Sequence, residues 1–288
     1  FGAVLIFMAV RIPIFLVAKG YTLPELNFEN LHPDNLPRWP FMCITVACGA
    51  ISGFHATQSP IISRCLASER SGRKIFYGAM IAESIIAMVW ATAGIAFYQS
   101  TGGLQNALAT LQQSGVVYDI CTSLMGVAGG VIAIVGVVAC PITSGDTAFR
   151  SARLALSDWI GLDQKPFKNR LLLSIPCLAI GAALVCVDFN VVWRYFAWSN
   201  QTLATIMLWT ASMYLVVNAK DKRYSLLTAI PAAFMTAAIV TYILAADEGL
   251  RLGVSIATPV GFVVAIAVLA VFVAKKLLSK GAGAPLAN

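Results

Sequence analysis

The chain has 288 residues, of which 59% are hydrophobic and only 11% are charged, whereas soluble domains carry about 25% charged residues. This composition excludes an ordinary soluble enzyme and indicates a protein of the lipid bilayer. The net charge is +7, but the basic residues occur in short clusters between apolar segments, a distribution that reflects membrane topology and not a nucleic-acid-binding patch. The seven cysteines include no CxxC pair, so neither a disulfide framework nor a metal site is predicted.

Apolar segments alternate with polar connections along the whole chain. A membrane-spanning helix needs about 20 residues, and eight segments come near that length. They cover approximately residues 1–18, 41–56, 75–98, 117–139, 171–187, 195–217, 225–245 and 254–274. The predicted fold class is all-α, with residues 1–288 forming a single transmembrane domain, a polytopic helix bundle. Because the first residue already lies in an apolar run, we expect a fragment of a longer protein.

The basic residues are divided unequally between alternate connections. Fifteen of the 20 lie at 63–74, 141–170, 219–224 and after residue 274, and the opposite connections hold four. Cytoplasmic connections of membrane proteins are enriched in Lys and Arg. The sequence therefore predicts a cytoplasmic segment at 141–170, a cytoplasmic carboxyl terminus, and external loops at 20–40 and 99–116.

Hydrogen-bonding side chains follow the second apolar segment within one turn. They are His55, Thr57 and Gln58, and Pro60 comes shortly after them. Proline removes a backbone donor and disfavours helix at the residue before it, so a helix break is predicted at Pro60. Two interpretations fit: a broken helix that lines a solute path, with these three residues as substrate ligands, or an interfacial helix end capped by polar residues.

A second polar stretch follows the fourth apolar segment. Pro141 is predicted to end that helix, and Thr143 with Asp146 three residues later resembles a capping box that opens a new one. Backbone amides at such a helix start form an anion site, and we predict Thr143, Ser144 and Asp146 as substrate-binding residues there. The alternative is a solvated cytoplasmic helix in which Asp146 pairs with Arg150 four residues later.

Two adjacent amides, Asn200 and Gln201, follow a group of aromatic residues at 193–198 that is typical of a membrane interface. An unpaired amide in hydrocarbon costs about 2 to 7 kcal/mol, so both side chains are predicted to have partners. These partners are either neighbouring helices or a polar substrate.

The carboxylate of Glu83 lies inside an apolar segment, about two turns from its cytoplasmic end. The surrounding Ala, Ile and Met side chains remove its hydration, which favours the protonated form. Glu83 is therefore predicted to carry a coupling proton, with His55 as a second proton site. The alternative is a neutral, hydrogen-bonded glutamate with a structural role.

Four stretches together resemble one family. They read ACGAISGFHATQSP, GRKIFYGAMIAESIIAMVWATAGIAFY, PITSGDTAFRSAR and RYFAWSNQTLA. They are similar to the bacterial carbon starvation protein A family over most of residues 40–215. The resemblance implies a multi-pass inner-membrane protein linked to nutrient uptake during carbon starvation, with peptides as substrates or, in related members, pyruvate coupled to protons. It also implies two inverted repeats of five helices around broken helices, as in amino-acid transporters.

The leading functional prediction is therefore a secondary transporter that imports a small carboxylate-bearing nutrient, a peptide or pyruvate, with the proton as coupling ion. A membrane sensor that binds a solute without moving it is the alternative. No Walker A, HExxH or GxSxG sequence occurs, so neither ATP drive nor a membrane-embedded hydrolase is predicted. No cofactor is predicted, and the partners expected are the solute, the coupling ion and the lipid bilayer.

Overall fold

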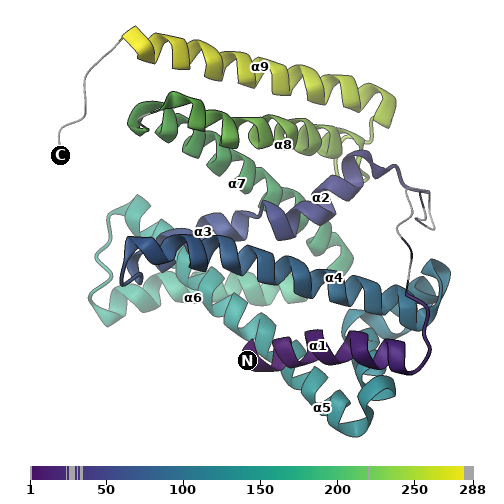
Figure 1. Cartoon of the computed structure of the whole chain (residues 1–288). Coiled ribbons are helices and arrows are strands. Elements are labelled where there is room, and N and C mark those ends of the chain that lie inside the picture. Colours follow the sequence, from purple (N-terminus) through teal and green to yellow (C-terminus); the bar gives the residue numbers. More distant parts are fainter. Residues whose placement is uncertain are drawn as a thin grey trace. The chain divides into compact units, whose positions relative to one another are not determined.

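The computed structural model describes residues 2–23, 25, 30, 32, 35–219 and 221–281. Within these residues every regular element is helical, which confirms the predicted all-α class (Figure 1). The long helices are α1 (Gly2–Ala18), α2 (Arg38–Ala50), α3 (Gly53–Arg64), α4 (Gly78–Tyr98), α5 (Thr101–Ile160), α6 (Phe167–Val185), α7 (Phe189–Asn218), α8 (Ser225–Ala245) and α9 (Val254–Gly281). Short helical turns lie at Glu69–Ser71, Arg73–Tyr77 and Lys222–Tyr224.

In the described part of the chain, five helical segments are long and apolar enough to cross a bilayer. They are Glu69–Tyr98, Thr101–Gly136, Phe167–Leu184, Lys222–Ala245 and Val254–Leu277. The helix α1 is apolar but shorter, with 17 residues. The predicted segment 225–245 coincides with α8 residue for residue. These helices make the chain a polytopic membrane protein, and the number of eight spans stays a prediction.

The break after the second apolar segment lies earlier than predicted. The helix α2 ends at Ala50, residues 51 and 52 are not helical, and α3 begins at Gly53. Pro60 lies inside α3, so the predicted break at Pro60 is wrong. A proline costs a helix one backbone hydrogen bond, a loss that membrane helices tolerate where neighbouring groups compensate it.

The helix α5 continues through position 141 as far as Ile160. The predicted helix end at Pro141 and the predicted new start at 143–146 are therefore wrong, as is the loop at 99–116, which is helical from Thr101 onward. The backbone of α5 departs from helical geometry at Gln112 and at Gly126, where φ is 68°. Glycine adopts this left-handed conformation without a Cβ clash, so α5 bends at the glycine and not at the proline.

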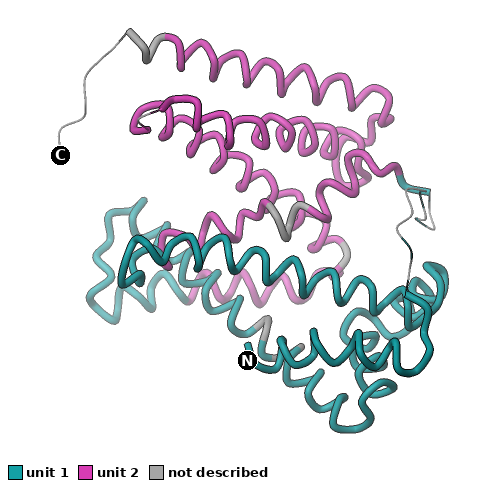
Figure 2. Tube along the Cα trace, in the orientation of Figure 1, with its two compact units in different colours: residues 1–36, 63–174 teal, residues 37–62, 175–288 magenta. Residues whose placement is uncertain are grey.

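The chain divides into two compact units (Figure 2). Unit 1 consists of residues 1–36 and 63–174, and α1, α4 and α5 pack together in it. Met8, Ile12 and Leu16 of α1 are buried and recur every four residues, which places them on one face of the helix. They pack with buried residues of α4 and α5 to form an apolar core.

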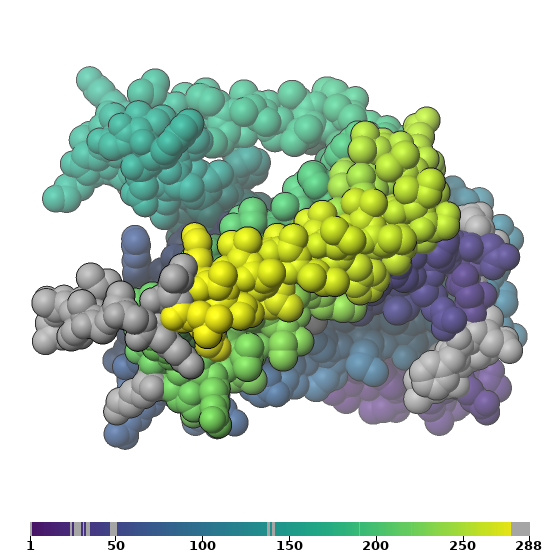
Figure 3. Space-filling view, turned by 90° about the horizontal axis from the view of Figure 1, so that it is seen from above, coloured from purple at the N-terminus to yellow at the C-terminus, as the bar shows by residue number. Residues whose placement is uncertain are grey.

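Unit 2 consists of residues 37–62 and 175–288, and α8 packs in it against α2, α7 and α9. Small residues bring α8 and α9 close together, since a Cβ at Gly261 of α9 would lie 2.7 Å from the carbonyl oxygen of Ala237. The outer face of α9 is uncovered (Figure 3), and Ile256, Val263 and Ile266 are exposed on this helix. Such an apolar face suits contact with lipid.

Candidate functional site

The candidate site begins at the break between α2 and α3, where Ser52 starts the new helix. Ser52 is 6% exposed, and its Oγ accepts a hydrogen bond of 3.2 Å from the backbone N–H of Phe54. This is the usual bond of a helix N-cap, which satisfies one of the free donors of the first turn. The N–H of His55 donates to the carbonyl oxygen of Ser52 at 3.1 Å. The break is thus a capped helix start buried inside unit 2.

Asn200 of α7 completes the cap from another part of the chain. Its Oδ1 accepts the Phe54 N–H at 3.0 Å, and its Nδ2 donates to Ser52 Oγ at 3.0 Å. Gly53 makes this approach possible, because a Cβ there would lie only 2.5 Å from the Asn200 carbonyl oxygen. The predicted need of Asn200 for a partner is confirmed, and a neighbouring helix supplies that partner.

Gln201, the next residue of α7, is fully buried. Its Nε2 donates to the carbonyl oxygen of Ile44 in α2 at 3.3 Å. Because that carbonyl can only accept, the side-chain amide is oriented with nitrogen toward Ile44. Its Oε1 has no hydrogen-bond partner within the described part of the chain. A buried acceptor of this kind is costly to leave unpaired, so Gln201 offers a position for a further donor.

An apolar cluster surrounds these polar groups. Its buried members include Ile44 of α2 and Met235, Ile239 and Tyr242 of α8. Trp198 of α7 packs on the cluster, and its Nε1 donates to the Ile239 carbonyl oxygen at 3.2 Å. The cluster fixes α7 against α2 and α8, so the amides of Asn200 and Gln201 are held in place by packing.

Three further residues predicted for the site follow the break along α3. His55, Thr57 and Gln58 lie in its first two turns and are partly buried. Thr57 Oγ1 donates to the Phe54 carbonyl oxygen at 3.0 Å. The structure therefore places these three residues in the same unit as Asn200 and Gln201, beside the positive end of the α3 dipole.

The other predicted ligands, Thr143, Ser144 and Asp146, lie inside α5, in unit 1. The backbone amides there belong to a continuous helix. The predicted helix start is therefore wrong, and substrate binding by these three residues stays a prediction. The predicted pair of Asp146 and Arg150 is confirmed, at 2.8 Å between Oδ2 and Nη2, and both side chains are more than half exposed.

Glu83 lies on α4, in unit 1, and its side chain is exposed in the described chain. The expected shielding by neighbouring side chains is thus not supplied by unit 1, and proton coupling by Glu83 stays a prediction. No group of three His, Cys, Asp or Glu side chains in the described segments is arranged to hold a metal ion.

Sequence reasoning missed Ser52 and Ile44. A signal for Ser52 exists, because a serine directly before a helix is a common N-cap. No local signal marks Ile44, since its contribution is a backbone carbonyl that Gln201 reaches from 157 residues away.

Apolar helices of spanning length and a buried polar break define the class as a polytopic helical membrane protein. The chain belongs to the carbon starvation protein CstA family, whose family model matches residues 1–113 and 91–242.

Curated relatives extend this assignment. The chain is 44% identical over 121 residues to an uncharacterized protein of Haemophilus influenzae, covering 42% of this chain and 86% of that protein. It is 28% identical over 276 residues to the peptide transporter CstA of Bacillus subtilis, covering 80% of this chain and 46% of the relative. A 52-residue stretch is 50% identical to the pyruvate/proton symporter BtsT of Escherichia coli, covering 18% of this chain and 7% of the symporter. No solved structure matches.

Proposed function

We propose that this protein is a secondary active transporter of a bacterial inner membrane. It imports a small carboxylate-bearing nutrient, and a proton gradient drives the import. The observation that supports it best is the meeting of Ser52, Asn200 and Gln201 at a buried break between two helices. Transporters place solute sites at such breaks, where irregular backbone offers polar groups at membrane depth. The names of the two transporter relatives support the same class.

The start of α3 is the proposed position for the carboxylate of the solute. Backbone N–H groups and the positive end of the helix dipole favour an anion there. The Phe54 N–H now donates to the neutral Oδ1 of Asn200, so a carboxylate would replace that oxygen. His55, Thr57 and Gln58 follow on the same helix and complete the proposed binding face.

Gln201 favours a peptide over pyruvate. Its Oε1 is a buried acceptor without a partner in the described residues, and a peptide carries N–H and ammonium donors that satisfy such an acceptor. Pyruvate carries none. The proposed substrate is therefore a short peptide whose carboxylate lies at α3 and whose nitrogen donates to Gln201.

Uptake into vesicles tests this proposal. The natural full-length protein, reconstituted with and without an imposed pH gradient, should accumulate a labelled short peptide only with the gradient. Replacing Gln201 by Met keeps the side-chain length and removes the acceptor, so the KM for peptide should rise about tenfold, the equivalent of one hydrogen bond of about 1.4 kcal/mol. Gln105→Met on the exposed surface of α5 is the matched control.

Two results would contradict the proposal. Transport of only cations or neutral sugars would exclude a carboxylate-bearing nutrient. Tight solute binding without any uptake would favour the alternative, a membrane sensor that binds a solute without moving it. An unchanged peptide KM in Gln201→Met would remove Gln201 from the site and leave the transport function standing.

Glu83, which lies nearer the predicted cytoplasmic end of α4, is the proposed proton carrier. His55 at the break is the proposed second proton site. Glu83→Gln fixes the neutral state and keeps the size of the side chain. It should lose accumulation driven by the pH gradient and retain counterflow exchange of labelled solute. Accumulation equal to that of the natural protein would make Glu83 a structural residue.

The proposed topology has a cytoplasmic carboxyl terminus and an external loop at 20–40. It follows from the unequal distribution of basic residues. A membrane-impermeant thiol reagent added to intact cells should modify a cysteine placed at Asn30 and spare one placed at Ser68. The opposite pattern would reverse the orientation.

A further inference from the structure

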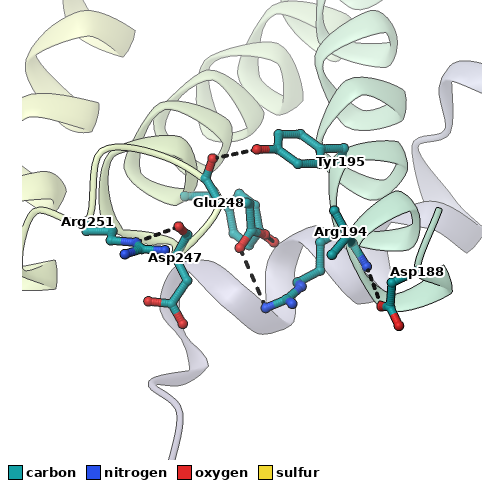
Figure 4. Close-up of polar contacts among 8 residues, drawn as sticks. Asp188, Arg194, Tyr195, Asp247, Glu248 and Arg251 are labelled. Atoms are coloured by element: carbon teal, nitrogen blue, oxygen red, sulfur yellow. Dashed lines mark hydrogen bonds and ion pairs between the residues drawn. The ribbon is translucent and has the colours of Figure 1, made fainter.

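A buried carboxylate lies in the connection between α8 and α9, at residues 246–253 (Figure 4). The side chain of Glu248 is only 8% exposed. Its Oε1 accepts a hydrogen bond from the hydroxyl of Tyr242 in α8, and its Oε2 lies 4.0 Å from Nη1 of Arg194 in α7. Its backbone carbonyl oxygen accepts a hydrogen bond of 3.1 Å from the hydroxyl of Tyr195. Glu248 thus joins α7 and α8 to the connection.

The other charged groups nearby have contacts of their own. In the connection itself, Arg251 Nε donates to the backbone carbonyl of Asp247 at 2.7 Å. At the start of α7, Asp188 Oδ1 accepts the N–H of Val191 at 3.3 Å. In α2, the ring of Phe41 contacts the ring of Tyr242, with 5.5 Å between the ring centroids. The charged residue of α2, Arg38, lies at the start of that helix. Arg194 is the cation that forms an ion pair with Glu248.

The negative charge of Glu248 is only partly compensated. The distance of 4.0 Å to Arg194 is long for an ion pair, and the Arg194 side chain is 48% exposed, so solvent screens the attraction. A buried carboxylate is stable in its charged form only when it is well paired and hydrogen-bonded. A bound proton removes the charge, preserves a hydrogen bond with Tyr242 and cancels the attraction to Arg194.

We propose that Glu248 is a proton-binding residue of the transport cycle and that its ion pair with Arg194 is a latch on α7 that proton binding opens. The proposal rests on the transport function proposed above. Arg194 precedes Asn200 by less than two helical turns, so loss of the ion pair changes the contacts of α7 close to the site amides. In the predicted topology the connection 246–253 is external and Glu83 is nearer the cytoplasm. A proton from the outer solution would therefore bind first at Glu248 and be released on the inner side.

The pH dependence of transport tests the latch. In vesicles that hold the natural full-length protein, the KM for the labelled peptide should fall as the outer pH is lowered, because a neutral Glu248 no longer pairs with Arg194 close to the site amides. Glu248→Gln should make KM independent of outer pH and lower the accumulation ratio to about 1, the value for uncoupled transport. Its maximal counterflow rate should be retained. Glu248→Asp should restore the pH dependence.

Asp247→Asn is the matched control, because Asp247 is the neighbouring carboxylate and its side chain is exposed. This variant should keep the pH dependence and the accumulation ratio of the natural protein. If Glu248→Gln behaves like Asp247→Asn, the latch is overturned while transport stands. If the natural protein moves none of the tested solutes, the proposed function itself fails, and the latch fails with it.

A second variant covers the case in which Glu248→Gln does not fold. Tyr242→Phe removes the hydrogen bond to Oε1 and preserves the ring that contacts Phe41. Loss of a donor to the carboxylate favours its protonated form, so the midpoint of the KM against pH curve should move to higher pH. An unmoved midpoint would overturn the proposal.

Discussion

The two units differ in what their cores contain. In unit 1 the buried residues are almost all apolar, with Ser157 as the buried polar residue among those described. In unit 2 the buried polar residues are Ser52, Asn200, Gln201, Thr205, Ser212, Ser225, Thr236 and Thr241. Buried polar groups require specific partners, so unit 2 depends on particular pairs where unit 1 depends on apolar packing. The buried polar groups among the described residues are therefore concentrated in unit 2.

Polar contacts also differ in their range along the chain, from neighbours on one helix to pairs of residues in distant segments. Asp146 and Arg150 in unit 1 are four residues apart, and Tyr98 donates to Asp119 Oδ2 at 2.7 Å across the turn from α4 to α5. In unit 2, Asn200 and Ser52 are separated by 148 residues. A local pair forms wherever its helix forms, but a distant pair forms only when several helices pack correctly. Substitutions in the distant pairs should therefore have the larger effects.

The largest effect is expected from Gly53→Val. The new Cβ would lie 2.5 Å from the Asn200 carbonyl oxygen, so the start of α3 must move away from α7, and overpacking of this kind costs about 3 kcal/mol. The apparent melting temperature of the detergent-purified protein measures the loss. Gly78→Val in α4 is the control, because a Cβ there meets no atom within 4 Å. Equal losses in both variants would show that the close approach at Gly53 is unimportant.

Asn200→Ala should have the next largest effect. It removes two buried hydrogen bonds and leaves Ser52 Oγ and the Phe54 N–H with fewer partners, at a cost of about 2 kcal/mol in the free energy of unfolding. Asn218→Ala in the same helix removes an exposed contact to the Tyr214 carbonyl oxygen and serves as the control. Thermal unfolding of the two variants, measured side by side, gives the difference in their stability. Equal stability of the two variants would show that the cap bonds of Asn200 contribute no more than an exposed contact.

Trp198→Phe should cost about 1 kcal/mol. It preserves an aromatic ring in the apolar cluster and removes the N–H that donates to the Ile239 carbonyl oxygen. Trp193, which is 53% exposed, provides the control Trp193→Phe. Amide hydrogen exchange near Ile239 reports on this bond directly, and exchange as slow as in the natural protein would show that the bond contributes nothing.

The smallest effect is expected from Asp146→Asn. An exposed pair four residues apart on a helix contributes about 0.3 to 0.5 kcal/mol and is screened by salt. Raising the salt concentration should therefore remove the difference between the variant and the natural protein in thermal unfolding. A loss as large as that of Asn200→Ala would erase the contrast between the two units.

The sequence alone was enough to predict the helical class, the ends of one helix and one local ion pair. The apolar segment 225–245 became α8 with the same ends, and the spacing of Asp146 and Arg150 correctly predicted their contact. It also showed that Asn200 and Gln201 need partners, because hydrocarbon supplies none. These features depend on residues within about one helical turn of each other, and the sequence contains that information directly.

The packing of the helices determined where they break and which distant groups meet. Proline suggested breaks at 60 and 141, but a proline removes one hydrogen bond and the surrounding fold determines whether the helix continues. The break instead lies at Ser52, where Asn200 of α7 completes the cap. The burial of Glu248, in a connection that reads as a polar loop, depends on Tyr242 and Arg194 from two packed helices. Such contacts arise from the packing of elements far apart in the chain, and no local pattern specifies them.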